Sequence, residues 1–247
     1  EATCQALRDG VTHYTSNMGL LELRQALSSY VQKTYGVTYG PEREILITVG
    51  VSEALDLALR ALINPGDEVL YHEPCYVSYA ADVIFAHGVP IAVETRAEDG
   101  FRLTRKMLEE RVTPRTKLLL LNFPNNPTGA TLAREDVAEI AAFAREHDLI
   151  VITDEIYAEL SYDAPHSSIA AEPGMRERTL FLHGFSKAWA MTGYRMGYAC
   201  GPEELIEAMM KVHQYTMLCA SSCVQHAAIE ALRQPEEDIG IMRREYE

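Results

Sequence analysis

The sequence contains few basic residues and no long apolar run. It has 22 lysines and arginines against 36 aspartates and glutamates, which gives a formal net charge of −14. A chain this acidic repels nucleic acids and anionic membranes, so we expect neither as a partner. No apolar run approaches the roughly 18–20 residues of a membrane-spanning helix, and no basic segment followed by an apolar stretch marks a signal peptide. The composition predicts a soluble protein.

Cysteine is also scarce, and its spacing indicates no covalent framework. The five cysteines are an odd number, and no His or Cys stands near them at the spacing of a zinc site. We therefore expect no metal, and five reduced packing residues in a cytoplasmic protein. They are Cys4, Cys75, Cys200, Cys219 and Cys223. The motif G-x-G-x-x-G is missing after the first predicted strand, which disfavours a nicotinamide-dependent oxidoreductase.

Short apolar runs alternate with helix-length segments along the chain. Predicted strands cover residues 45–49, 68–71, 89–93, 117–122, 149–153, 179–183 and 196–200. The runs are continuous rather than alternating, which is typical of strands covered on both faces. Apolar residues recur at helical spacing between them, as from Leu20 to Thr34, where Gly36 ends the predicted helix. The pattern predicts an α/β fold, a doubly wound and mostly parallel sheet with helices on both faces.

Ligands in such sheets bind at the carboxyl ends of the strands, so the loop after each strand is informative. Residues 50–52, Gly-Val-Ser, follow the first strand and begin a helix. The free amides at a helix start suit an anion, although many helices begin this way. Tyr76 follows the second strand. It either lies against a flat ligand or belongs to the core.

Two further loops carry polar side chains directly after buried strands. Asn125 and Asn126 lie between two prolines, which fix the backbone and hold the asparagine amides in place. Asp154 and Tyr157 follow residues 149–153. A carboxylate at the end of an apolar strand needs a cation or a protonated ring nitrogen, unless it only caps a helix.

The last of these loops carries two cations. Lys187 and Arg195 follow residues 179–183 within a segment of small residues. A lysine that opens onto a packed site can condense with a carbonyl, whereas an isolated Ser-Lys pair is more often an exposed loop. Together the strand ends imply a flat aromatic ligand with a phosphate, a protonated ring nitrogen, a phenolic oxygen and an aldehyde. Pyridoxal 5′-phosphate (PLP) has all four groups.

Three segments resemble class I/II aminotransferases of PLP fold type I. They are Asn125-Asn-Pro-Thr-Gly129, Asp154-Glu-Ile-Tyr157, and Gly184-Phe-Ser-Lys187 with Arg195. The resemblance implies that Lys187 forms the Schiff base and later moves the proton. It implies that Asp154 holds the pyridine nitrogen protonated and is catalytic with Lys187 and Tyr157.

The same resemblance implies the remaining cofactor contacts. Asn126 and Tyr157 would bind the phenolic oxygen, and Tyr76 would stack on the ring. The phosphate would be held by Val51, Ser52 and Arg195, with Ser186 as a weak substitute for the family's serine, whose place Gly184 takes. Tyr14 matches a tyrosine that reaches the phosphate of the neighbouring subunit, so a homodimer is implied.

The resemblance also implies how the chain is divided and what it does. Residues 1–235 would form the PLP-binding large domain, with a helical N-terminal segment over residues 1–40. Residues 236–247 would begin an interdomain helix that leads to a small domain absent from this chain. The expected function is amino-group transfer between an amino acid and a 2-keto acid. A PLP-dependent carbon–sulfur lyase or decarboxylase on the same site, and an aminotransferase-like ligand-sensing module, stay open as alternatives.

Overall fold

A computed structural model describes residues 1–162, 164–233 and 236–247. The strands are β1 (Ile45–Thr48), β2 (Glu68–Glu73), β3 (Val89–Glu94), β4 (Thr116–Asn122), β5 (Ile150–Asp154), β6 (Thr179–Gly184) and β7 (Gly197–Cys200). The α-helices are α1 (Ala2–Arg8), α2 (Leu21–Tyr35), α3 (Gly50–Leu62), α4 (Ser78–Phe85), α5 (Arg105–Glu109), α6 (Arg134–Glu146), α7 (Glu203–Thr216), α8 (Ser222–Arg233) and α9 (Glu236–Tyr246). All seven predicted strands are therefore present.

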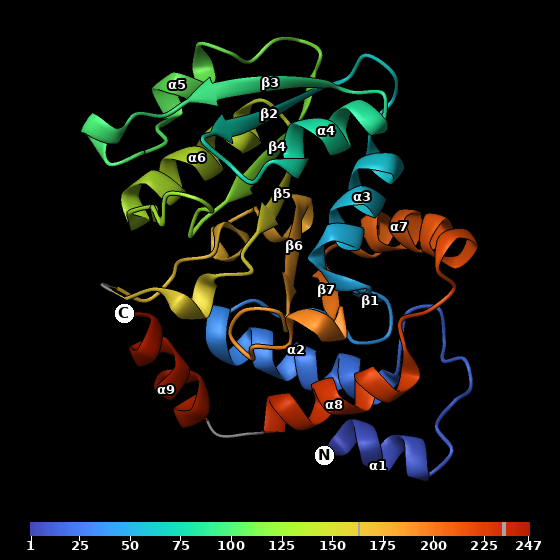
Figure 1. Ribbon diagram of the computed structural model, residues 1–247. Coiled ribbons are helices and arrows are strands. Elements are labelled where there is room, and N and C mark those ends of the chain that lie inside the picture. Colours follow the sequence, from blue (N-terminus) through green and yellow to red (C-terminus); the bar gives the residue numbers. More distant parts are fainter. Residues whose placement is uncertain (163, 234–235) are drawn as a thin grey trace.

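The strands form one seven-stranded sheet in the order β1-β7-β6-β5-β4-β2-β3 (Figure 1). The pairs from β6 through to β3 are parallel, and β7 runs antiparallel to both β6 and β1. The prediction of a doubly wound, mostly parallel α/β sheet is confirmed. Because β2, β4, β5 and β6 are parallel, the loops that follow them meet at one edge.

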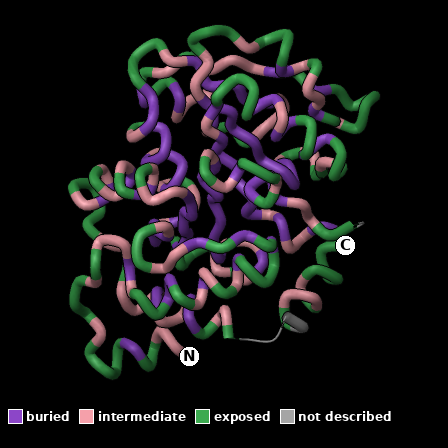
Figure 2. Tube along the Cα trace, turned by 180° about the vertical axis from the view of Figure 1, so that it is seen from behind, coloured by how far each residue is buried: buried purple, intermediate pink, exposed green. Residues whose placement is uncertain are grey.

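Helices cover both faces of the sheet, which explains why the inner strands are largely apolar. On β4, Leu118 and Leu120 pack in one core cluster with residues of α3, α4 and α7. Leu119 and Leu121 point to the other face, where α5 and α6 cover them. At the β1–β7 end, α2 and α8 cover that second face. Apart from the edge strand β3, the strands are accordingly almost continuously buried (Figure 2).

The N-terminal segment contains two helices. α1 ends at Arg8 and α2 begins at Leu21, with no helix between them. α2 ends where Gly36 adopts the left-handed conformation with φ of 74°, as the glycine in the sequence predicts. The predicted domain boundary lies between residues 235 and 236, and residue 235 is outside the described residues.

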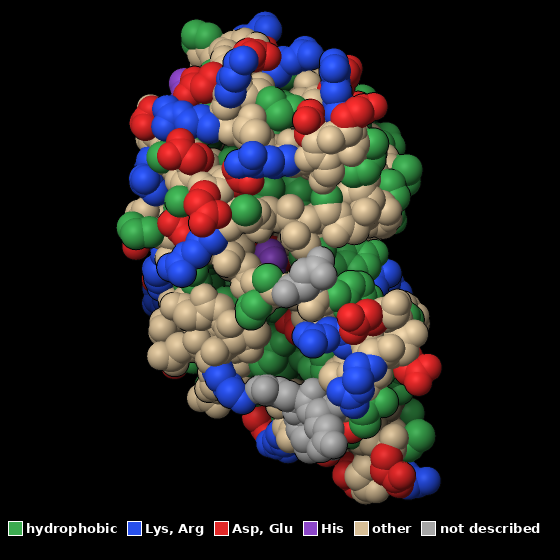
Figure 3. All heavy atoms as spheres, turned by 90° about the vertical axis from the view of Figure 1, so that its left-hand side faces the viewer, with side chains coloured by type: hydrophobic (Ala, Val, Ile, Leu, Met, Phe, Trp, Pro, Cys, Tyr) green, Lys and Arg blue, Asp and Glu red, His purple; other side chains and the backbone are tan. Residues whose placement is uncertain are grey.

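Charged side chains on the surface are mixed by sign. Figure 3 shows lysines and arginines interspersed with aspartates and glutamates on the face that carries α5 and α6. Ion pairs account for part of this pattern, since Arg105 contacts both Glu109 and Glu146. Among the described residues, no helix combines the length and the apolar character needed to cross a bilayer.

Three glycines allow β6, β7 and the start of α3 to approach one another closely. A Cβ atom on Gly197 would lie 2.5 Å from the carbonyl carbon of Gly50 and 2.6 Å from the amide nitrogen of Val51. A Cβ atom on Gly184 would lie 2.9 Å from the Cα of Gly197. All three distances are below any normal contact, and all three partners are backbone atoms that cannot rotate away. The N-terminus of α3 is therefore pressed directly against two strands.

This packing predicts that Gly197→Ala destabilises the fold. Overpacking a close contact costs about 1–3 kcal/mol, and here it also displaces the start of α3. Gly193→Ala is the matched control, because no atom lies within 4 Å of a Cβ built on Gly193. Urea denaturation of both variants measures the difference in the free energy of unfolding. Equal stability of the two variants would contradict the packing described.

Candidate active site

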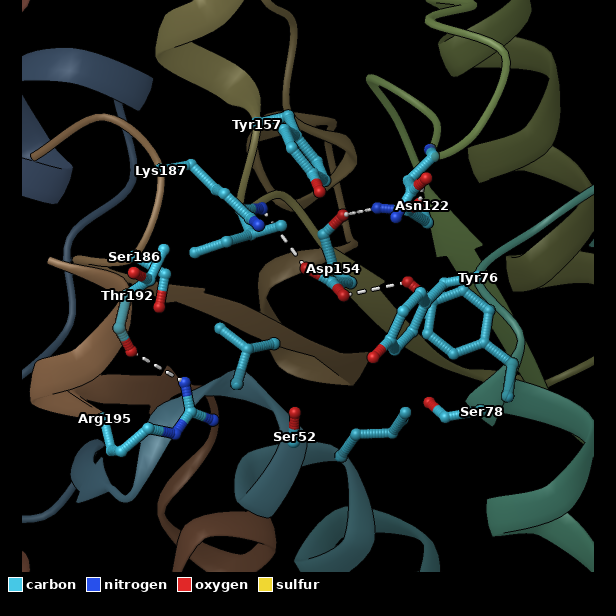
Figure 4. Close-up of a pocket in the computed structure, with 15 residues that line it drawn as sticks. Ser52, Tyr76, Ser78, Asn122, Asp154, Tyr157, Ser186, Lys187, Thr192 and Arg195 are labelled. Carbon is cyan, nitrogen blue, oxygen red and sulfur yellow. Dashed lines mark hydrogen bonds between the residues drawn. The ribbon is translucent and has the colours of Figure 1, made fainter. Parts of the chain in front are cut away.

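A hollow of about 240 Å³ lies at the carboxyl edge of the sheet (Figure 4). Nine residues predicted for the site line it: Val51, Ser52, Tyr76, Asn126, Asp154, Tyr157, Ser186, Lys187 and Arg195. They come from the N-terminus of α3 and from the loops after β2, β4, β5 and β6. Tyr14 is not among the lining residues, and 81% of its surface is exposed.

Asp154 ends β5 and is almost fully buried. The hydroxyl of Tyr79 donates to Oδ2 at 2.8 Å, and the amide of Ile156 donates to Oδ1 at 3.2 Å. Burial raises the pKa of Asp154 to about 6, although these two hydrogen bonds act in the opposite direction. Within the described part of the chain, no lysine or arginine forms an ion pair with this carboxylate. The site thus holds a buried acid that a cationic ligand group would stabilise.

Lys187 lines the same hollow as Asp154, in a loop that is held by backbone hydrogen bonds. The amide of Phe185 donates to the carbonyl of Met196 at 3.0 Å, and the amide of Ala190 donates to the carbonyl of Lys187 at 3.0 Å. The Nζ atom lies 5.3 Å from the centre of the Tyr157 ring. The amine is therefore held beside a phenol at the wall of the hollow (Figure 4).

Arg195 and the start of α3 form an anion-binding corner. Arg195 adopts a left-handed conformation with φ of 51°, and its Nη1 donates to the carbonyl of Thr192 at 3.1 Å. A Cβ atom on Gly50 would lie 2.6 Å from Nη2, so the guanidinium rests against the helix start. Amides of a first helical turn have no partner within the helix. These amides and the cation together suit a phosphate, with Ser52 beside them.

The loop after β4 is held in place by asparagines. The backbone amide of Asn126 donates to Oδ1 of Asn122 at 3.1 Å, which holds the Asn126 backbone in place. Asn125 Oδ1 accepts from the hydroxyl of Thr128 at 2.7 Å. Asn122 Nδ2 in turn donates to the carbonyl oxygen of Asp154 at 2.9 Å, which ties this loop to β5. Asn126 is thereby fixed at the edge of the hollow.

Sequence reasoning did not identify several residues that line the hollow. Tyr79, Asn122 and Thr192 are the polar ones that make described hydrogen bonds there. Tyr79 stands three positions after Tyr76, a spacing that returns a side chain to the same side of a helix. Asn122 is the last residue of its predicted strand, which was a usable signal. Thr192 acts through its backbone carbonyl, for which the sequence holds no signal.

Position 184 has no room for a side chain. The Cβ of a serine there would lie 2.8 Å from the carbonyl oxygen of Met196 and 3.3 Å from Val51 Cγ2. The absence of a hydroxyl at this position therefore follows from the packing of β6 against β7. Ser186, two residues further on, does line the hollow.

A second hollow of about 730 Å³ adjoins the first. Asn126, Tyr157 and Lys187 belong to both. Its other walls include Pro124 in the loop after β4 and Tyr246 at the end of α9. The lysine amine and the tyrosine ring thus stand between two spaces, and the larger one can admit a second molecule.

Comparison with known proteins supplies the family. The sequence profile of "Aminotransferase class I and II" matches residues 1–246. The Bacillus subtilis (strain 168) protein YugH, whose name calls it an aminotransferase, is 49% identical over 246 residues, covering 100% of this chain and 64% of that protein. Aromatic-amino-acid aminotransferase 2 of Thermococcus litoralis is 44% identical, covering 98% of this chain and 63% of that protein.

The fold comparison agrees with the sequence comparison. The crystal structure of an aromatic aminotransferase from Pyrococcus horikoshii OT3 superposes with a TM-score of 0.97 at 44% identity. The match covers 99% of this chain and 66% of that one. The chain therefore spans a little under two thirds of the length of the curated relatives it matches.

Class I and II aminotransferases use PLP, and the residues of the hollow fit this cofactor. The buried carboxylate of Asp154 suits the protonated ring nitrogen, and the anion-binding corner at α3 and Arg195 suits the phosphate. Asn126 and Tyr157 offer donors for a phenolic oxygen, and the Lys187 amine suits the aldehyde. Each kind of group that the cofactor requires is thus present around this hollow.

The raised pKa of Asp154 predicts a pH-dependent stability difference in the cofactor-free protein. A carboxyl with a raised pKa stabilises the fold below its unfolded pKa, and this contribution is lost as the pH rises through about 6. Relative to Asp154→Asn, the wild-type free energy of unfolding should fall by roughly 2 kcal/mol between pH 4 and pH 7. Urea denaturation at a series of pH values measures it.

Tyr79→Phe tests the assignment to Asp154. Loss of the tyrosine hydrogen bond removes an effect that lowers the pKa of Asp154. The fall in the free energy of unfolding should therefore occur at higher pH than in the wild type. If the difference in unfolding free energy between the wild type and Asp154→Asn stayed constant with pH, the pKa of Asp154 would not be raised.

Proposed function

Because this chain belongs to the class I and II aminotransferases, we propose that the protein moves an amino group between an amino acid and a 2-keto acid with PLP bound at Lys187. The observation that carries the proposal is that Lys187, Asp154 and the anion-binding corner line the same hollow. An isolated loop lysine would have no such surroundings. The chain covers 64% of its relative YugH, so the activity is a proposal for the whole protein.

Each predicted residue of the hollow has a proposed task in holding the cofactor. Asp154 keeps a proton on the ring nitrogen by charge, and Tyr79 and the Ile156 amide hold its carboxylate in place. Asn126 and Tyr157 donate to the phenolic oxygen, and Tyr76 lies on the ring. The phosphate is bound by the amides of Val51 and Ser52, by the hydroxyls of Ser52 and Ser186, and by Arg195.

The bound cofactor supplies an electron sink for the bond broken at the substrate Cα. Lys187 Nζ removes the α-proton of the amino acid. When a 2-keto acid is converted in the reverse direction, the same amine delivers a proton to its α-carbon. Its place beside the Tyr157 ring keeps the amine close to the hollow and limits the directions in which it can move. The larger adjoining hollow admits the amino acid or the keto acid.

We also propose a homodimer in the cytoplasm. Tyr14 is 81% exposed on its own subunit, as expected of a residue that reaches the phosphate of a neighbouring one. All five cysteines are free, which suits a reducing compartment. The division into a cofactor-binding domain over residues 1–235 and the start of an interdomain helix stays a prediction.

Covalent capture tests the role of Lys187. Addition of PLP should give a yellow protein, and borohydride should fix the cofactor on Lys187, as peptide mass spectrometry can show. Lys187→Ala should lose capture completely while keeping its circular dichroism spectrum. Lys211→Ala is the control, because Lys211 is exposed on α7 and pairs only with Glu207 among the contacts described. Capture at another lysine in the wild-type protein would overturn the assignment.

Product analysis tests the reaction. Aspartate and aromatic amino acids are the first substrates to examine, since relatives are named for them. Transamination consumes one keto acid for each keto acid formed and releases no ammonia or carbon dioxide. Pyruvate and ammonia without a keto-acid acceptor would indicate a lyase, and carbon dioxide would indicate a decarboxylase. Capture at Lys187 without any turnover of the full enzyme would favour a ligand-sensing module.

A further inference from the structure

A largely buried carboxylate, Glu159, lies close to the hollow without lining it. Glu159 belongs to the short helical turn Ala158–Leu160, two residues after Tyr157. Its Oε1 accepts from the hydroxyl of Tyr30 at 2.5 Å and also from that of Tyr35, both on α2. Its Oε2 lies 3.0 Å from Nε2 of His183. Three donors thus satisfy a carboxylate that burial would otherwise penalise.

His183 connects this carboxylate to the lysine loop. It lies in β6, four residues before Lys187, and its side chain is fully buried. The amide of Gly184 donates to Nδ1 at 2.7 Å. An acceptor at Nδ1 requires a lone pair there, so the ring hydrogen is on Nε2 and is donated to Glu159. The imidazole therefore bridges the segment that carries Tyr157 and the loop that carries Lys187.

The protonation state of His183 follows from the same geometry. Burial lowers the pKa of His183, but the neighbouring Glu159 carboxylate outweighs it and the net direction is upward. A proton on Nδ1, however, would face the hydrogen of the Gly184 amide. The short hydrogen bond at Nδ1 therefore favours the neutral ring with its hydrogen on Nε2.

Aromatic packing prevents the imidazole from turning. The ring stacks on Phe181 with 5.7 Å between ring centres, and on Tyr198 with 5.6 Å. Trp189, two residues after Lys187, packs edge-on against His183 and against Tyr30 of α2. The loop that carries Lys187 is thus held by His183 before the lysine and by Trp189 after it.

We propose that Glu159 and His183 form a positioning pair, which with Tyr30 and Tyr35 of α2 sets the distance between Lys187 and Tyr157. Neither residue of the pair lines the hollow, so they act through the backbone segments that they join. The inference rests on the proposed roles of Lys187 and Tyr157. It adds α2, far away in the sequence, to the elements on which turnover depends.

Glu159→Gln replaces the carboxylate with a neutral amide of nearly the same volume. This weakens the connection between the segment that carries Tyr157 and the loop that carries Lys187. In the cofactor-free protein, the Gly184 amide should exchange with solvent faster than in the wild type. In the holoenzyme, kcat should fall roughly 10- to 100-fold with KM changed by less than about twofold, since a displaced amine costs rate more than binding. A stable Glu159→Gln variant with wild-type kcat and wild-type Gly184 exchange would overturn the positioning pair.

A milder pair of variants covers the case in which Glu159→Gln does not fold. Tyr35→Phe removes one donor to Glu159, whereas Tyr39→Phe removes a buried hydroxyl of the same core cluster that has no described partner. Only Tyr35→Phe should lower kcat, by a few-fold, and raise the exchange rate of Gly184. If the two variants had the same kcat and the same Gly184 exchange rate, Tyr35 would be only a packing residue and the proposal would be overturned.

Nitrogen-15 spectra of His183 in the cofactor-free protein test the bridge without any turnover. A shift typical of an unprotonated Nδ1 and a protonated Nε2 is expected, and the reverse tautomer or an imidazolium would overturn the bridge. The proposed function fails separately: borohydride capture at another lysine in the wild-type protein would refute it. Capture at Lys187 with unaffected variants would refute the positioning pair alone.

Discussion

The site depends on one constraint, the burial of the sheet on both faces. With α3, α4 and α7 on one side and α2, α5, α6 and α8 on the other, the strand interiors have almost no place for an unpaired polar group. Polar side chains are confined to the strand ends, where loops can supply hydrogen bonds. Since four neighbouring strands are parallel, these ends meet at one edge. The gathering of chemistry at that edge is thus a result of how the core is covered.

Three acids near β5 show how surroundings give the same functional group different tasks. Asp154 has two donors and no described cation, and burial raises its pKa. Glu155 is equally buried but pairs with His166 and accepts from Ser168, which joins two stretches of backbone. Glu159 is surrounded by two phenols and an imidazole. Only the first of these acids is left with a deficit that a ligand can fill.

The sequence predicted what depends on local pattern. Continuous apolar runs predicted the seven strands. Residues at strand ends predicted eight members of the hollow, because strand polarity carries them to the same edge, and the family resemblance added Ser186. It did not predict contacts set by packing between distant elements. Tyr79 resembles any helix residue until α4 places it on Asp154, and Glu159 and His183 are separated by 24 positions. The lack of room at Gly184 depends on β7, which no local pattern near that residue reveals.

The antiparallel strand β7 has a consequence for how the protein is made. β1 has β7 as its partner in the sheet, in a register that joins Ile45 to Cys200 and Thr48 to Gly197. During synthesis the first strand and the helix start that follows it must wait, without a sheet neighbour, until the chain has grown past residue 200. Contacts so distant in sequence close slowly and leave apolar edges exposed in the meantime. The anion-binding corner is therefore completed among the last parts of the sheet, and a nascent chain is expected to need protection over its N-terminal segment until then.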